Sequence, residues 1–384
     1  MLSRRVAGII AVTGLACSYT ASAQEAARAT PPTQAERAKV QLAILLDTSG
    51  SMDGLIEQAK SQIWSIVNTF ATAEHAGQRP ELEVALYQYG NDGLSSKEGH
   101  VQMISGLTTD LDLISEKLFA LSTNGGEEWC GWAIRSATSQ LNWSESDSDL
   151  RIIVIAGNEA FTQGSVASAK SCEAAVRKGI IINTVFCGND NEGRSTGWYD
   201  GAILGEGQYS YIDQNQAIAE VPTPHDAELL TLNTRLNGTY IHYGYAGEQM
   251  LARQVEADQS AQELAAGVLQ ERVSAKASTA YVNKHWDLVD AVVLDELDVS
   301  KLKNEELPEN MRKMSAEERV KYVETKRAER AEIQRAIQQL SEARTKFIAD
   351  ERAKQAGTEA ESLGSALSSM VKRQAEAKGY TFKK

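Results

Sequence analysis

The chain has 384 residues, with 39 Lys and Arg against 52 Asp and Glu, and a formal net charge of −13 at pH 7. This length allows roughly two to three domains with ample core. The acidic balance repels a phosphate backbone, so the composition argues against nucleic acid as a partner.

The first segment along the chain has the pattern of a secretory signal. Arg4 and Arg5 precede an apolar run over residues 6–16, and Ala21-Ser22-Ala23 follows as a cleavage site. A twin-arginine signal and a lipoprotein signal at Cys17 fit this pattern less well. We predict cleavage after Ala23, a signal peptide over residues 1–23, and an exported protein that is periplasmic or secreted, with no transmembrane segment. Residues 24–38, rich in Ala, Pro, Thr and Gln, predict a flexible leader.

From residue 39 to residue 245, strands and helices alternate. Uninterrupted apolar runs or alternating patterns predict strands at residues 42–46, 83–89, 101–104, 151–156, 179–186 and 209–212. Helical spacing of apolar residues predicts helices at residues 55–73, 110–121, 131–141, 166–178, 196–204 and 224–236. This order predicts an α/β domain, a doubly wound, Rossmann-like and mainly parallel sheet of six strands with helices on both faces.

Residues 246–384 change to Ala, Glu, Gln, Lys and Arg, which predicts an α-helical extension. Helices are expected at residues 249–277, 308–354 and 361–377. In the second of these, an apolar stripe is interrupted by Lys326 and Arg330. Two arrangements stay open, a coiled coil that allows self-association and a hairpin packed on the preceding domain.

The stretch most informative about function follows the first strand. Asp47, Ser49 and Ser51 place one carboxylate and two hydroxyls at alternate positions, with Gly50 between them. Oxygen donors from one short loop suit a hard divalent cation, Mg²⁺ first, with Ca²⁺ or Mn²⁺ as alternatives. In a parallel sheet this loop lies at the carboxyl ends of the strands, where ligands bind. The competing interpretation is a turn that caps the next helix.

This D-x-S-x-S pattern resembles the metal-ion-dependent adhesion site (MIDAS) of von Willebrand factor A (VWA) domains, and the resemblance covers residues 38–244. It implies two further ligand loops, normally Gly-Gly-Thr and Thr-Asp-Gly. Here Glu127 follows Gly125-Gly126, and Asn158 stands at the position of the Asp. The resemblance therefore implies a modified site of Asp47, Ser49, Ser51, Glu127 and Asn158, with Glu128 and Glu159 as further ligands or outer contacts. Alternatively, the two consecutive acids only favour the start of the next helix.

The resemblance also implies a binding module without catalysis, which engages another protein through or beside the ion. Two alternatives stay open, a metal-free scaffold that interacts through the helical extension and a metal-assisted hydrolase. Against the hydrolase, the sequence has no G-x-S-x-G and no H-E-x-x-H motif.

Without the signal peptide three cysteines remain, Cys130, Cys172 and Cys187. An odd number in an oxidising compartment suggests one disulfide and one spare thiol, with the pairing undetermined. The alternative is that they are small buried side chains.

Overall fold

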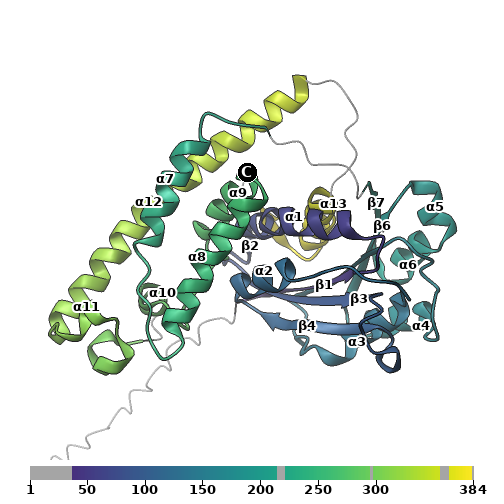
Figure 1. Ribbon diagram of the computed structural model, residues 1–384, viewed down its shortest axis with the longest axis horizontal. Helices are drawn as coiled ribbons and strands as arrows, with labels where there is room; N and C mark the ends of the chain where they lie inside the picture. The colour runs from purple at the N-terminus through teal and green to yellow at the C-terminus, as the bar shows by residue number, and fades with distance from the viewer. Residues whose placement is uncertain (1–36, 214–220, 295–296, 355–362, 383–384) are drawn as a thin grey trace, which may run out of the picture. The chain divides into compact units, whose positions relative to one another are not determined.

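Six segments of the chain lie side by side in one sheet of a computed structural model that describes residues 37–213, 221–294, 297–354 and 363–382 (Figure 1). The order across the sheet is β4-β3-β1-β5-β6-β7, and every neighbouring pair is parallel except β3 with β4. The strands are β1 (Lys39–Asp47), β3 (Glu81–Tyr89), β4 (Val101–Thr108), β5 (Leu150–Gly157), β6 (Ile181–Cys187) and β7 (Glu206–Ile212). The predicted mainly parallel, six-stranded sheet is confirmed.

The central strand β1 is buried on both faces, as its uninterrupted apolar run predicts. It pairs with β3 on one side and with β5 on the other, so the chain reverses its direction of travel across the sheet beside β1. At the carboxyl end of this register Asp47 lies opposite Tyr89. The loop that follows β1 therefore lies at the switch point where open α/β sheets bind ligands.

The two faces of the sheet carry separate cores. Leu42, Ile44 and Leu46 of β1 belong to the core on the side of α1 (Asp53–Ala71) and α2 (Leu111–Phe119). The alternate residues Ala43 and Leu45 belong to the core on the opposite side. That opposite side is covered by α3 (Cys130–Gln140), α4 (Ser168–Val176) and α6 (Trp198–Leu204), with the short α5 (Asp190–Ser195) beside α6. Helices on both faces agree with the predicted doubly wound class.

The predicted α-helical extension after the sheet is confirmed, and two of its helices pack on α1. Its helices are α7 (Asp226–Asn237), α8 (Gly247–Leu264), α9 (Ala266–Lys276), α10 (Leu288–Val293), α11 (Glu309–Arg312), α12 (Ala316–Lys354) and α13 (Leu363–Ala377). The helix expected at residues 249–277 is interrupted at Ala265, whose backbone is extended. Both α9 and α13 contact α1, while α12 contacts α7 and α9. No described helix has the length and apolar character needed to cross a membrane.

The last described residues return to the sheet. Gln374 of α13 and Asn183 of β6 exchange two hydrogen bonds of 3.0 and 2.6 Å between their buried side chains. After α13, β8 (Tyr380–Phe382) pairs antiparallel with β2 (Ala73–His75), the strand that directly follows α1. Part of the predicted extension thus completes the α1 face of the sheet, whereas the predicted signal peptide and most of the leader lie outside the described residues.

The long helix α12 packs within its own chain. Its apolar stripe is buried at Val323, Ile333 and Ile337. Arg330, which seemed to interrupt the stripe, is buried too, and its guanidinium donates to both carboxylate oxygens of Asp287 at 2.6 and 3.1 Å. Of the two arrangements left open by the sequence, the described residues show the packed one.

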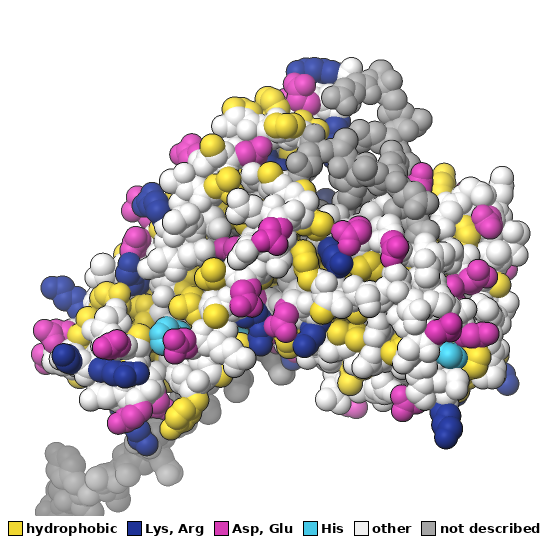
Figure 2. Space-filling view, viewed as in Figure 1, with side chains coloured by type: hydrophobic (Ala, Val, Ile, Leu, Met, Phe, Trp, Pro, Cys, Tyr) yellow, Lys and Arg dark blue, Asp and Glu magenta, His cyan; other side chains and the backbone are white. Residues whose placement is uncertain are grey.

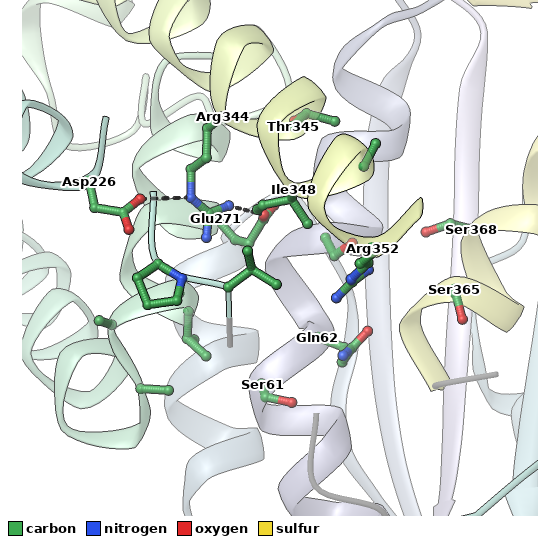
Figure 3. A pocket seen from close by; sticks show the side chains of 18 of the residues that line it. Ser61, Gln62, Asp226, Glu271, Arg344, Thr345, Ile348, Arg352, Ser365 and Ser368 are labelled. Carbon is green, nitrogen blue, oxygen red and sulfur yellow. Dashed lines mark hydrogen bonds and ion pairs between the residues drawn. The ribbon is translucent and has the colours of Figure 1, made fainter. Parts of the chain in front are cut away.

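A pocket of about 670 Å³, lined by polar and apolar side chains, lies between α1, α9, α12 and α13 (Figure 3). Arg344 of α12 crosses one wall, where its guanidinium bonds Asp226 at 3.1 Å and Glu271 at 2.8 Å. Because two carboxylates already neutralise this Arg, it is not a free anion receptor. The two ion pairs in this wall join α12 to α7 and α9.

A buried cluster of charges joins α8 and α9 to the helices of the sheet. The Arg272 guanidinium of α9 donates to Asp112 of α2 and to Asp258 of α8, each at 2.6 Å. The ammonium of Lys276 lies 2.8 and 3.0 Å from the two carboxylate oxygens of Asp258. Tyr281 donates to the second Asp112 oxygen at 2.6 Å. The cluster is balanced, with two cations and two anions.

We expect this cluster to weaken in acid. Burial acts to raise the pKa of Asp258, but the charges of Lys276 and Arg272 outweigh it and hold that pKa well below its usual range. The unfolded chain therefore takes up this proton near pH 4, before the folded chain does, and the stabilisation present above that pH is lost as the pH falls further. Urea unfolding between about pH 6 and pH 3 should give a shallower decline for Asp258→Asn than for the wild type. An equal decline of the free energy of unfolding with pH in the two proteins would contradict a lowered pKa for Asp258.

Candidate metal centre

The loop after β1 gathers the three predicted ligands of the D-x-S-x-S pattern. Asp47 ends the strand and is fully buried, and its Oδ1 accepts a hydrogen bond of 2.8 Å from the Ser49 backbone N–H. The hydroxyl oxygens of Ser49 and Ser51 are 3.2 Å apart. Thr48 anchors the loop, because its backbone N–H donates to the backbone carbonyl of Tyr89 at 2.8 Å. Asp47, Ser49 and Ser51 thus lie in one loop, and their binding of a metal stays a prediction.

The second loop brings Glu128, rather than Glu127, beside Asp47. Gly125 adopts the left-handed conformation at φ +61°, and its carbonyl accepts from the Gly50 N–H at 2.5 Å. A Cβ placed on Gly90 would lie 2.7 Å from Asp47 Oδ1 and 2.8 Å from Glu128 Cγ, so both acidic side chains lie against this one glycine. Glu128 is only 4% exposed.

Glu127 lies at the surface instead. Its carboxylate accepts a hydrogen bond of 3.1 Å from the indole N–H of Trp129. The sequence motif selected Glu127 because it follows the two glycines directly, but side-chain direction in the loop depends on the Gly125 backbone. Glu128, and not Glu127, therefore lies beside Asp47, and ligation of a metal by either residue stays a prediction.

The third loop contributes Asn158. Its side-chain N–H donates to Ser51 Oγ at 3.1 Å, which ties it to the first loop. Glu159 is exposed, and its backbone carbonyl accepts from the indole of Trp198 at 2.7 Å. Gly157 packs directly against the Asp47 side chain, since a Cβ on Gly157 would lie 3.0 Å from Asp47 Oδ2. The amide thus reaches the centre, while the neighbouring carboxylate lies at its rim.

Three oxygens at this centre are buried without a hydrogen-bond partner in the described residues, namely Asp47 Oδ2, Glu128 Oε2 and Asn158 Oδ1. Such atoms are rare because each costs the desolvation free energy of a polar group. Burial raises the pKa of Asp47 well above its usual range, and the Glu128 carboxylate raises it further. Burial also raises the pKa of Glu128. A cation bound between the two carboxylates would offset both costs.

The donor set fits a hard divalent ion. Two carboxylates, two hydroxyls and one amide carbonyl are all oxygen donors, as Mg²⁺ prefers, and waters usually complete its coordination. No group of three or more His, Cys, Asp or Glu side chains suited to a metal occurs in the described part of the chain. A site here thus depends on the Ser and Asn oxygens as well as on Asp47 and Glu128.

Asn91 is a supporting residue that sequence reasoning missed. Its side-chain N–H group reaches the backbone carbonyls of Thr48 at 3.3 Å and Ser122 at 3.1 Å. It therefore ties the loop after β1 to the loop that carries Glu128. The signal in the sequence is the run Gly90-Asn91-Asp92 directly after the predicted strand at residues 83–89.

The three described cysteines are free and buried, so the disulfide suggested by their odd number is absent among them. Cys130 and Cys172 belong to the core on the α3 side of the sheet, whereas Cys187 belongs to the core on the α1 side. Burial raises the pKa of all three thiols, that of Cys172 to about 12. They act as small apolar side chains.

Comparison with known proteins finds a family model that matches part of the chain. Residues 41–194 match the family model described as the von Willebrand factor type A domain. No curated protein matches the chain.

Solved structures with similarity to this chain include the conserved hypothetical protein BatB from Bacteroides thetaiotaomicron, at 18% identity over 45% of this chain and 90% of that one, with a TM-score of 0.34. An aerotolerance-related membrane protein from Bacteroides fragilis is 20% identical over 45% and 92%, with a TM-score of 0.33. The pilus adhesin SpaC from Lactobacillus rhamnosus GG is 13% identical over 46% and 28%, with a TM-score of 0.35. These values are too low to transfer a ligand or a partner to this chain.

Proposed function

We propose that this chain, whose residues 41–194 are a von Willebrand factor type A domain, binds a divalent cation in that domain and engages another protein at the same edge of the sheet. VWA domains mediate protein–protein interactions, and many of them bind a divalent cation at the MIDAS. The observation that supports a metal here is the set of three unpartnered, buried oxygens of Asp47, Glu128 and Asn158.

In this proposal, Mg²⁺ is the ion of first choice, with Ca²⁺ or Mn²⁺ as alternatives. Asp47 and Glu128 supply the negative charge, Ser49 and Ser51 supply hydroxyl oxygens, and Asn158 supplies its carbonyl oxygen. The charge that the usual third-loop Asp would provide comes from the second loop instead. When bound, the ion would hold the three loops together and present a coordination position at the surface. No catalytic step is part of the proposal.

The proposal also includes export to the periplasm or the cell exterior. Its support is the sequence of residues 1–23, with a basic start, an apolar run and an Ala-Ser-Ala cleavage site. Cleavage after Ala23 is checked by the amino-terminal sequence of the protein recovered from its native host.

A pair of matched substitutions tests the metal centre. Glu128→Gln should lower the affinity for Mg²⁺ at least about tenfold, because it removes one of two carboxylates from the ion. Glu127→Gln should change it by no more than about twofold, as expected for an exposed side chain outside the centre. Isothermal titration of the whole chain with Mg²⁺ measures both.

The two variants differ only in which of two consecutive acids becomes an amide. A larger effect of Glu127→Gln would restore the ligand set that the sequence motif implied. Equal affinity of both variants and the wild type would show that neither acid binds the ion, and the metal centre as drawn here would be wrong.

A further inference from the structure

The edge of the sheet around the candidate centre is strongly acidic. The parallel strands end at this edge, so it collects the loops of residues 48–53, 90–100, 120–129, 158–167 and 188–195. The exposed acidic residues in these loops are Asp53, Asp92, Glu98, Glu127, Glu159 and Glu192. Figure 2 shows Asp and Glu side chains on the surface of the end of the sheet that carries α5.

Basic residues do not balance this rim. The loops just described contain Lys97 and Arg194. The Arg194 guanidinium lies 3.0 Å from Asp190 and also stacks over the ring of Tyr199, at 4.4 Å from its centroid. Within the segments that form the rim, Lys97 alone then remains to offset the exposed carboxylates, and these segments keep a net negative charge.

A metal ion bound at the candidate centre would not reverse the negative charge of the rim. Asp47 and Glu128 are both buried and each has an unpartnered carboxylate oxygen, so together they match the charge of one divalent cation. With that ion bound, the centre is close to neutral. A carboxylate arriving from a partner would meet a neutralised ion and the surrounding negative rim, and like charges across an interface are costly.

We infer that the partner bound at this edge presents Lys or Arg side chains, and not the Asp or Glu that would complete the coordination of a less neutralised ion. This inference rests on the proposed function, because it concerns the same edge and the same ion. The exposed carboxylates of the rim attract a basic segment at long range, and the unpartnered oxygens below them add to the negative potential whenever the ion is absent. The partner is thus a protein with a basic segment.

The test compares two synthetic peptides, one of alternating Lys and Ser and one of alternating Glu and Ser, each titrated in Mg²⁺ against the whole chain. The Lys peptide should bind at least about tenfold more tightly, with an association rate that falls as salt is added. The double variant Glu98→Lys/Glu192→Lys should slow its association about tenfold, because both side chains lie in the rim.

The matched control is Glu332→Lys/Glu342→Lys on the exposed side of α12, which makes the same change in net charge away from the rim. It should slow association by no more than about twofold, since charges beyond a Debye length are screened. Equal effects of the two double variants, or tighter binding of the Glu peptide, would overturn the inference.

A Mg²⁺ titration of the same samples separates this inference from the proposed function. Glu98 and Glu192 lie outside the centre, so their variant should still bind Mg²⁺, with an affinity lowered only by the changed charge of the rim, and this binding also reports an intact fold. If the wild type binds no Mg²⁺ while the rim variant still slows the Lys peptide, the metal proposal fails and the basic partner stands. If Mg²⁺ binds to the wild type and the rim variant associates with the Lys peptide as fast as the wild type does, the metal proposal stands and the inference of a basic partner fails.

Discussion

Arg272→Met is expected to lower the free energy of unfolding by about 3–5 kcal/mol, the range for removing one partner of a buried ion pair. The Arg272 side chain is fully buried and its guanidinium bonds Asp112 and Asp258, each at 2.6 Å. Methionine fills much of the same volume but leaves Asp112 without a cation and Asp258 with Lys276 alone. The cost comes from the carboxylates left behind.

Urea unfolding measures this loss, and Arg177→Met is its matched control. Arg177 is exposed on the surface and lies 3.9 Å from Glu173, so losing this pair should cost no more than about 1 kcal/mol. Adding Asp112→Asn to Arg272→Met should recover part of the stability, because it removes the unpaired charge. A loss for Arg272→Met as small as the control's would contradict a desolvated cluster.

This cluster also shows where the sequence was least informative. The long helices from residue 246 onward are rich in Lys, Arg and Glu, which are exposed to solvent in most proteins. Yet Arg272, Lys276 and Arg330 are buried, each beside an Asp distant in the sequence. Whether a charged side chain is buried depends on a partner that local periodicity does not reveal.

The strands, in contrast, were predictable because their signal is local. Residues 151–156 form an apolar run with no polar residue after Arg151, and β5 is buried along its whole length. The packing of α13 against α1 was not predictable from a local pattern of this kind. Its first residue, Leu363, donates its backbone N–H to the Gln58 side chain of α1, across 305 positions of sequence. Nothing in the sequence near residue 363 indicates that partner.

At the candidate centre the sequence predicted the loops but not every side chain in them. Asp47, Ser49 and Ser51 follow from a rigid turn at the end of a buried strand, so their spacing fixes their relative position. Glu127 and Glu128 are consecutive and chemically alike. The positive φ of Gly125 and the close approach of Gly90 decide which of them faces Asp47, and neither is visible in the sequence.

Mg²⁺ at a hundred times its dissociation constant should raise the free energy of unfolding of the wild type by about 2.7 kcal/mol, provided that the ion binds only the folded chain. In Asp47→Asn this gain should vanish, because the fully buried carboxylate that anchors the ion is gone. Thermal and urea unfolding, each in chelator and in Mg²⁺, measure the gain. Glu57→Ala, which removes an exposed carboxylate from α1, should keep it.

The same variant makes a second, opposite prediction in chelator. Without the ion, Asp47 and Glu128 are two buried carboxyls beside one another, and burial together with their mutual repulsion raises the pKa of Asp47. Holding both charged at neutral pH then costs stability, since a raised carboxyl pKa favours the folded state only at lower pH. Asp47→Asn keeps the acceptor for the Ser49 N–H and removes one charge, so in chelator it should be at least as stable as the wild type. A variant that is less stable in chelator and still gains from Mg²⁺ would place the ion elsewhere.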